Sequence, residues 1–271
     1  MARRICILGA GNMGRALIGG LLRSGMRPEQ LSAGESQPAA REALAREFAV
    51  TATADNRAAI AGAAVVVLAV KPQEAAAVLG ALAGPLAAAP PLVISIVAGV
   101  RIAALESACG PAVPLVRAMP NRPALIGAGI TGLYAPPSVA AAQRVEATQV
   151  LSAVGEVVWV AAEENLDVVT ALSGSGPAYF FLLAELMAAA GRQLGLEAAI
   201  AQRLAAVTLR GSGLLVQSGD EDLARLRAEV TSPGGTTEAA LQALTAAGLG
   251  TTVIQALAAA TRRSRELADA R

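Results

Sequence analysis

The chain has 271 residues, a formal net charge of +1 and no histidine. Its length suits one or two domains. Because the net charge is close to zero, neither nucleic acid nor an acidic membrane is an expected partner. The absence of histidine excludes Ser-His-Asp and Cys-His catalysis. The two cysteines have no metal-ligand spacing, so no metal site is predicted.

The apolar composition does not by itself predict a membrane protein. The long uncharged stretch at 75–100 is interrupted by Pro85, Pro90 and Pro91, whereas a spanning helix needs about 20 apolar residues in register. We predict a helix, a turn and a buried strand there instead. The N-terminus enters a strand at once and shows no signal peptide, so we expect a cytoplasmic protein without a membrane partner.

The first 160 residues alternate between apolar strands and amphipathic helices. Strands are expected at 4–8, 31–34, 64–70, 92–97, 115–118, 130–134 and 156–160. Helices are expected from the end of the glycine loop at 9–14 to about residue 22, and at 38–48, 73–82 and 138–152. Ser36 is the candidate N-cap of the helix at 38–48. This alternation predicts βαβ units and a doubly wound sheet, with ligands bound at the edge where the strands end.

Strand signals stop after residue 162, and helical spacing of Ala, Leu, Glu and Arg continues to the C-terminus. We therefore predict two domains, an α/β domain at 1–162 and an all-helical domain at 163–271. Several of the later helices are apolar on most faces, which favours burial between subunits.

A glycine loop follows the first predicted strand. The pattern Gly9-x-Gly11-x-x-Gly14 lies between a strand and a helix, the context in which it indicates a dinucleotide site. Gly9 permits a tight turn, Gly11 lets the backbone approach a pyrophosphate, and Gly14 allows close helix packing. The helix start then offers free N–H donors. The alternative is a glycine-rich turn without a ligand.

Two further residues belong to the predicted ligand edge. Glu35 follows the second strand, about 20 positions after the loop, where an acid accepts hydrogen bonds from the adenosine ribose and repels a 2′-phosphate. It therefore favours NADH over NADPH, unless it is only a solvated loop residue. Lys71, in Ala69-Val-Lys-Pro72, either meets the cofactor phosphates or faces water.

The segment 230–238 joins a hydroxyl-rich Pro-Gly-Gly turn to a helix start. Amides of Gly235, Thr236 and Thr237 would point from the helix tip and offer a carboxylate site, with the Thr237 hydroxyl beside it. The alternative is an ordinary capped helix.

Four segments taken together resemble the pyrroline-5-carboxylate reductase family: Ser232-Pro-Gly-Gly-Thr-Thr237, Ser173-Gly-Ser-Gly-Pro-Ala-Tyr179, Arg117-Ala-Met-Pro-Asn121 and Ala69-Val-Lys-Pro72. The resemblance covers nearly the whole chain. It implies a Rossmann domain followed by a helical dimerisation domain, a homodimer that often assembles into larger rings, and reduction of 1-pyrroline-5-carboxylate to L-proline by NAD(P)H.

The resemblance also implies site residues. Those expected at the cofactor are Leu8, Gly9, Ala10, Gly11, Asn12, Met13, Gly14, Glu35, Asn56, Ala69, Val70, Lys71, Pro72, Ile96, Val97 and Ala98. Those expected at the substrate are Glu163, Ser232, Gly234, Gly235, Thr236 and Thr237. NADPH-preferring members tend to carry a hydroxyl or basic residue where Glu35 stands, so NADPH and NADH both stay open, with Glu35 favouring NADH.

Our mechanistic hypothesis relies on positioning and electrostatics. The imino acid would enter between the two domains, with its carboxylate at the helix start and its ring nitrogen hydrogen-bonded to Thr237, the predicted catalytic residue. A β-hydroxyacid dehydrogenase is the nearest alternative, but its expected lysine is missing from the helix at 177–190. A non-catalytic dinucleotide-binding sensor would keep the glycine loop without needing Thr236 and Thr237.

Overall fold

The computed structural model of the chain describes residues 4–219 and 222–269. The outermost residues of the two predicted domains, 1–3 and 270–271, lie outside these ranges. The chain forms two compact units. The first runs to Gly174 and resumes at Ala260, and the second is Ser175–Ala259. The boundary predicted between 162 and 163 stays a prediction.

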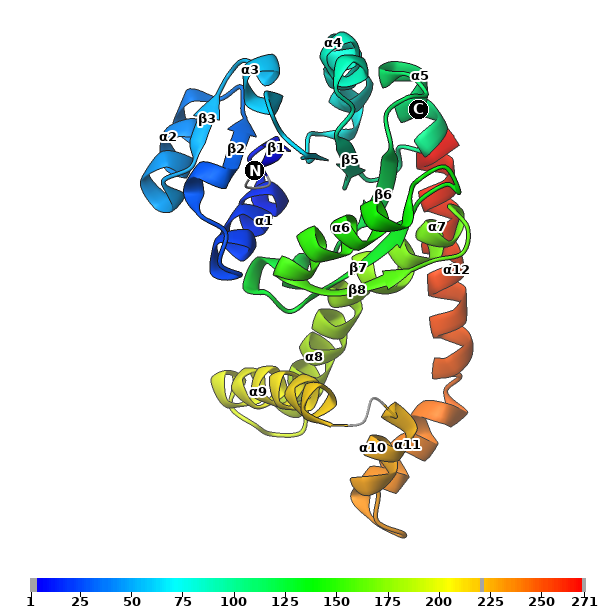
Figure 1. Cartoon of the computed structure of the whole chain (residues 1–271). Helices are drawn as coiled ribbons and strands as arrows, with labels where there is room; N and C mark the ends of the chain where they lie inside the picture. Colours follow the sequence, from blue (N-terminus) through cyan, green and yellow to red (C-terminus); the bar gives the residue numbers. More distant parts are fainter. Residues whose placement is uncertain (1–3, 220–221, 270–271) are drawn as a thin grey trace. The chain divides into compact units, whose positions relative to one another are not determined.

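The first unit is built on an eight-stranded sheet of order β3-β2-β1-β4-β5-β6-β7-β8 (Figure 1). Its strands are β1 (Ile5–Leu8), β2 (Leu31–Gly34), β3 (Thr51–Thr53), β4 (Val65–Leu68), β5 (Leu92–Ser95), β6 (Leu115–Met119), β7 (Gly129–Tyr134) and β8 (Gly155–Trp159). Only the β6–β7 pair is antiparallel among these strands. The strand order reverses direction between β1 and β4, which confirms the predicted doubly wound sheet.

Helices cover both faces of this sheet. Residues of α1 (Asn12–Arg23), α2 (Pro38–Phe48) and α6 (Ala141–Leu151) pack in one apolar cluster, and residues of α3 (Asn56–Ile60), α4 (Ala75–Ala88) and α5 (Ile102–Cys109) pack in the other. Strand β1 supplies both clusters, because successive side chains of a strand point to opposite faces. The central strands are therefore buried on both sides, as their continuous apolar runs predict.

Helix α4 is longer than predicted. It was expected to end at residue 82, before Pro85, yet it runs to Ala88 with Pro85 inside it. Proline cannot donate to the carbonyl four residues earlier, which belongs to Ala81. The Arg57 guanidinium donates to that carbonyl at 3.4 Å, and the buried Leu86 anchors the last turn.

The predicted N-cap of α2 is wrong. Gln37, not Ser36, occupies the N-cap position, and its side chain makes no capping bond. Ser36 instead donates its hydroxyl to Glu35 at 3.5 Å. Pro38 begins the helix, so one of the N–H groups that a cap would satisfy does not exist.

The prediction missed several short elements. These are β3, α3 and α5 and the 3-10 turns η1 (Pro28–Gln30), η2 (Pro72–Glu74), η3 (Arg122–Ile126) and η4 (Ser152–Val154). Helix α7 (Asn165–Val169) and the π-helical turn η5 (Thr170–Gly174) lie in the stretch that was predicted to be helical. Strand β3 lies at the sheet edge, and its three residues are too few to show an alternating pattern.

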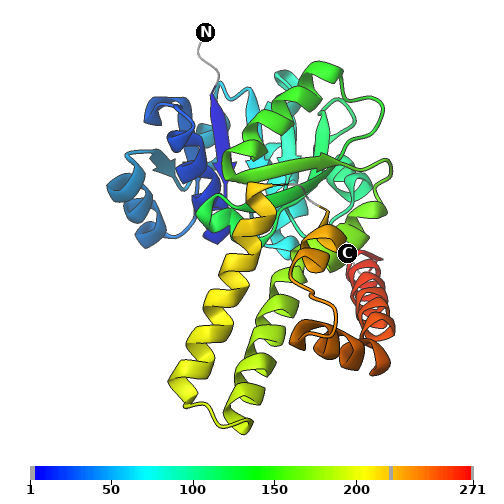
Figure 2. The ribbon, with the colours of Figure 1, turned by 90° about the horizontal axis from the view of Figure 1, so that it is seen from below.

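In its described residues, 175–219 and 222–259, the second unit contains helices and no strand, in agreement with the helical spacing predicted after residue 162. It comprises α8 (Gly176–Gln193), α9 (Ala198–Ser218), α10 (Leu223–Glu229), α11 (Thr236–Ala246) and the first part of α12 (Leu249–Asp269). Helices α8 and α9 pack side by side as an antiparallel hairpin (Figure 2). Helix α8 exposes seven large apolar side chains: Tyr179, Phe180, Phe181, Leu182, Leu183, Leu186 and Met187.

One continuous helical run in the described residues, Asn165–Gln193, is long and apolar enough to cross a membrane by length and composition alone. Its first turns are packed on the sheet of the first unit, because Leu166 and Ala171 are buried and Val169 lies against Gly132.

Candidate active site

Three central strands end at the same level of the sheet. Leu8 of β1 is in register with Leu68 of β4, and Leu68 with Ser95 of β5. The residues that follow continue the ladder: Ala69 donates its N–H to Leu8 at 2.7 Å, and Ile96 donates to Leu68 at 3.1 Å. The glycine loop, the Ala69 segment and the Ile96 segment therefore leave one edge, beside the point where the strand order reverses.

The geometry of the loop explains its glycines. Gly9 has φ +101°, and a Cβ there would lie 2.6 Å from the Ala69 carbonyl oxygen. At Gly14 a Cβ would collide with the Gly9 carbonyl. A Cβ at Gly11, in contrast, would meet nothing within 4 Å, so the space in front of this residue is open to a ligand. Helix α1 begins there without a side-chain cap or an acid in its first turn, which leaves N–H donors for an anion.

Glu35 lies against the loop. Its Oε2 accepts the Ala10 N–H at 2.8 Å, and its Oε1 accepts the Gln37 N–H at 2.8 Å. Arg41 donates to the carbonyls of Glu35 and Ser36, each at 2.8 Å, which holds the loop after β2 in place. Oε1 also accepts the Ser36 hydroxyl at 3.5 Å, whereas Oε2 keeps a second lone pair, so Glu35 can still accept a hydroxyl donor from a ligand.

These residues line a cleft of about 700 Å³ in the first unit. The lining brings together eight predicted cofactor residues or their neighbours: Gly9, Gly11, Gly34, Glu35, Asn56, Ala69, Val70 and Lys71. A side chain at Gly34 would collide with Asn56, so the floor of the cleft is closely fitted. The open space at Gly11, the uncapped helix start and the acid beside it fit a dinucleotide.

Other predicted cofactor residues lie around this cleft or beneath it. Leu8, Ala10, Gly14 and Val97 are buried, so only their backbone could face a ligand. Asn12 is exposed and Met13 partly buried at the start of α1, and Pro72 begins η2. Ile96 is partly buried and Ala98 exposed, after β5.

The sequence reasoning missed part of the lining, namely Ser36, Gln37, Gln73, Glu74, Ala77, Val78 and Ala81. Ser36 and Gln37 directly follow Glu35, so they could have been inferred from it. The residues of α4 could not, because only the packing of α4 against its sheet decides which face of the helix meets the cleft.

Glu163 lies in a polar network of the first unit. Its Oε1 accepts the Ile102 N–H at 2.8 Å and pairs with Arg117 Nη1 at 3.0 Å. Arg117 is buried, with 4% of its side chain exposed. Next to this pair, Asp167 is fully buried. It accepts the Ser264 hydroxyl at 2.7 Å and pairs with Arg101 at 3.5 Å.

The 232–237 segment belongs to the second unit. Helix α11 begins at Thr236, with Gly235 as its N-cap and no side-chain cap. The Gly235 N–H was expected to point at a ligand, but it donates to the Ser232 carbonyl at 3.0 Å, because the segment closes into a turn. The Gly234 N–H is also taken, by Glu238 at 2.7 Å. Within the described residues, the amides of Thr236 and Thr237 remain the donors of this motif available to a ligand.

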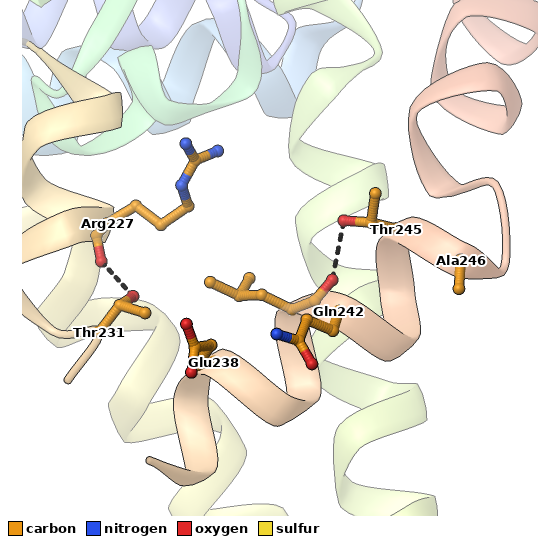
Figure 3. A pocket seen from close by; sticks show the side chains of 7 residues that line it. Arg227, Thr231, Glu238, Gln242, Thr245 and Ala246 are labelled. Carbon is orange, nitrogen blue, oxygen red and sulfur yellow. Dashed lines mark hydrogen bonds between the residues drawn. The ribbon is translucent and has the colours of Figure 1, made fainter. Parts of the chain in front are cut away.

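A pocket of about 580 Å³ with a mixed polar and apolar lining lies beside this helix start (Figure 3). Arg227 of α10 and Glu238 of α11 extend toward it, and its other lining residues are Thr231, Leu241, Gln242, Thr245 and Ala246. The Thr231 hydroxyl donates back to the Arg227 carbonyl of α10, and the Thr245 hydroxyl donates to the Leu241 carbonyl within α11. Neither Thr236 nor Thr237 lines this pocket.

The two cysteines, Cys6 and Cys109, are both buried. Burial raises the pKa of the Cys6 thiol to about 11, partly offset by a hydrogen bond with Ser32. Burial also raises the pKa of Cys109. Both thiols are therefore protonated near neutral pH and unsuited to nucleophilic chemistry.

Comparisons with known proteins agree with this geometry. A family model described as pyrroline-5-carboxylate reductase dimerisation matches residues 163–267, and one described as NADP oxidoreductase, coenzyme F420-dependent, matches residues 4–99. A pyrroline-5-carboxylate reductase of Pseudomonas aeruginosa is 48% identical over 98% of this chain and 97% of its own length.

Two solved structures are similar over the whole chain. A pyrroline-5-carboxylate reductase of Coxiella burnetii has a TM-score of 0.95 at 38% identity and covers 98% of this chain and 99% of its own. A pyrroline carboxylate reductase of Plasmodium falciparum, with NADP bound, has a TM-score of 0.81 at 28% identity and covers 98% of both chains.

Proposed function

The chain belongs to the pyrroline-5-carboxylate reductase family, and from this premise we propose that it reduces 1-pyrroline-5-carboxylate to L-proline, the last step of proline biosynthesis. It is an NAD(P)-dependent oxidoreductase acting on a carbon–nitrogen double bond. The observation that carries the proposal is full-length similarity at 48% identity, together with the dinucleotide-type cleft at Gly9, Gly11 and Gly14.

The cleft of the first unit would hold the cofactor. The uncapped start of α1 would receive the pyrophosphate, and Glu35 would accept hydrogen bonds from the adenosine ribose. When bound, the reduced nicotinamide supplies the hydride. Ile96, Val97 and Ala98, at the end of the neighbouring strand, would line its nicotinamide end.

The start of α11 would bind the substrate. The free N–H groups of Thr236 and Thr237 would hold the carboxylate, aided by the positive end of the helix. The Thr237 hydroxyl would hydrogen-bond the ring nitrogen and keep the double bond in a fixed orientation. A protonated imine accepts hydride more readily than a neutral one, and the proposed mechanism needs no histidine. Glu163 and Ser232 are the further substrate residues that the family resemblance implies.

The cofactor preference would be NADH. Glu35 is half-buried and fixed by two N–H donors, so it cannot easily turn away from a 2′-phosphate. Repulsion between the Glu35 carboxylate and the 2′-phosphate would weaken the binding of NADPH. The similar reductase of Plasmodium falciparum, in contrast, has NADP bound.

The functional form would be a homodimer in the cytoplasm, or a larger ring of such dimers. The dimerisation domain at 163–267 supports the dimer, as do the exposed apolar side chains of α8, because monomers rarely expose so contiguous an apolar surface.

The test of the proposed reaction is NADH and NADPH absorbance in the presence of 1-pyrroline-5-carboxylate. Both the loss of absorbance and the appearance of L-proline are expected. A dinucleotide-binding sensor would bind the cofactor without oxidising it, and a β-hydroxyacid dehydrogenase would instead reduce NAD⁺ with a hydroxy acid. Either of those outcomes contradicts the proposal.

The role of Thr237 is tested by Thr237→Ala. We expect kcat/KM to fall about 100-fold, the low end for help from one positioned group, while the Kd for NADH changes less than twofold. Thr245→Ala is the matched control, because Thr245 lies on the same helix and its hydroxyl bonds only within α11. Thr237→Ser should restore most of the loss. An unchanged kcat/KM in Thr237→Ala would remove this hydroxyl from the mechanism.

A further inference from the structure

Two acids of one segment, the part-buried Glu163 and the buried Asp167, hold the residues where α5 begins. Glu163 accepts the Ile102 N–H, and Asp167, one helical turn later, pairs with Arg101. Arg101 is the N-cap of α5 and Ile102 its first residue, and the side chain of Arg101 makes no capping bond. Glu163 therefore satisfies an N–H group that the helix itself leaves free.

The start of α5 is also the end of a short connection from β5. Between β5, which ends at Ser95, and α5, which begins at Ile102, the chain runs through residues 96–101. The first residue of this connection is fixed by its hydrogen bond to Leu68, and the last, Arg101, by its pair with Asp167. Glu163 fixes the residue that follows, Ile102. A shift of Ile102 must therefore move a connection of only six residues.

Arg117 decides where the Glu163 carboxylate lies. It comes from β6, and its guanidinium is nearly inaccessible to solvent, with Nη1 3.0 Å from the same Oε1 that accepts the Ile102 N–H. A buried guanidinium that pairs with a carboxylate is expensive to leave unpaired, so the arrangement has one strongly favoured geometry.

We propose that Arg117 is a positioning residue for the reduction: through Glu163 it fixes the start of α5, and thereby the conformation of residues 96–101 beside the nicotinamide. The effect on the reaction rests on the proposed function, which places Ile96, Val97 and Ala98 at the cofactor. The claim that Arg117 and Glu163 fix the conformation of residues 96–101 does not depend on the proposed function.

The first test needs neither substrate nor cofactor. Hydrogen–deuterium exchange of the peptide covering 96–102 is compared between wild type, Arg117→Met, Glu163→Ala and Glu163→Gln. We expect exchange at least tenfold faster in Arg117→Met and Glu163→Ala. Glu163→Gln keeps an oxygen acceptor for Ile102, so its exchange should stay near that of wild type. Arg144→Met is the matched control, because this part-buried guanidinium lies on α6 and binds the carbonyls of Ala135 and Pro136 instead.

The second test measures catalysis in the same variants. Single-turnover hydride transfer should slow 10- to 100-fold in Arg117→Met and Glu163→Ala, since misplacement of about 1 Å can cost that much. The Kd for NADH should change less than threefold, because the cleft at the glycine loop is untouched. Glu163→Gln should slow hydride transfer less than Glu163→Ala does, because its oxygen can still hold the Ile102 N–H.

Equal losses in Glu163→Gln and Glu163→Ala, with unchanged exchange at 96–102, would overturn the proposal and assign Glu163 a direct charge effect on the substrate. If Arg117→Met does not fold, the double variant Arg117→Met/Glu163→Gln removes the buried unpaired charge. Residues 96–102 should still exchange faster in this double variant than in Glu163→Gln alone. Equal exchange in the two variants would show that Arg117 does not position the start of α5. Failure of wild type to oxidise NADH with pyrroline carboxylate would sink the proposed function but leave the exchange result standing.

Discussion

Replacing Glu35 with serine should move the cofactor preference from NADH towards NADPH. The carboxylate accepts hydrogen bonds from Ala10 and Gln37, which fix it at the rim of the cleft. Serine removes the charge but keeps a small hydroxyl that can bind either a ribose hydroxyl or a phosphate oxygen.

The magnitude follows from two effects. Two unit charges about 4 Å apart repel by about 1 kcal/mol in water and about 4 kcal/mol near a protein surface. For the half-buried carboxylate of Glu35 we take a repulsion energy of about 2 kcal/mol, which weakens NADPH binding about 30-fold. A hydrogen bond from a ribose hydroxyl to a charged acceptor contributes about 1.5 kcal/mol, which strengthens NADH about tenfold. The ratio of kcat/KM for NADH over NADPH should therefore fall by about 100- to 300-fold in Glu35→Ser.

The assay is steady-state oxidation of each cofactor at saturating pyrroline carboxylate. Raising the ionic strength should reduce the wild-type preference and affect Glu35→Ser less, because salt screens the repulsion. Glu42→Ser is the matched control, since Glu42 is exposed on α2 and does not line the cleft. If Glu35→Ser leaves the ratio within threefold of wild type, Glu35 does not distinguish the two cofactors.

Two further predictions concern the first unit. Gly11→Ala should keep the wild-type Tm, because its Cβ meets nothing, but should weaken NADH binding at least tenfold in a fluorescence titration. Gly9→Ala should lower both the Tm and the affinity for NADH. Unimpaired NADH binding in Gly11→Ala would place the pyrophosphate elsewhere. The Cys6 thiol has a pKa of about 11 in the folded protein but its ordinary value of 9.0 in the unfolded chain, so the unfolded chain ionises first as the pH rises. The free energy of unfolding should therefore be highest below pH 9 and fall by about 3 kcal/mol as the pH rises to 11 and beyond. Urea unfolding at pH 8 and pH 11 should show that loss in wild type and less of it in Cys6→Ala, and equal losses in the two would refute it.

The parts of the fold that the sequence predicted are those with strong local signals. The apolar runs of β1, β4 and β5 and the glycine loop between β1 and α1 each carry their pattern within a few residues. The extent of α4 could not be predicted, because the donor that compensates for Pro85 is Arg57, a residue 28 positions earlier that only the fold brings near. Short elements such as β3 depend on pairing with β2 rather than on their own pattern.

The candidate site divides in the same way. Gly9, Gly11 and Glu35 could be predicted because the loop and the acid have a fixed spacing. The occupation of the Gly234 and Gly235 amides could not, since it depends on how the turn before α11 closes. The pairing of Arg117 with Glu163 joins residues 46 positions apart, and no periodicity indicates it.

The most direct measurement follows the hydride itself. NADH carrying deuterium at the transferable position of its nicotinamide is incubated with the protein and 1-pyrroline-5-carboxylate, and the product is analysed by mass spectrometry and NMR. The account predicts L-proline with one deuterium on the δ-carbon, the former imine carbon. Unlabelled proline, label on another carbon, or no proline would contradict it.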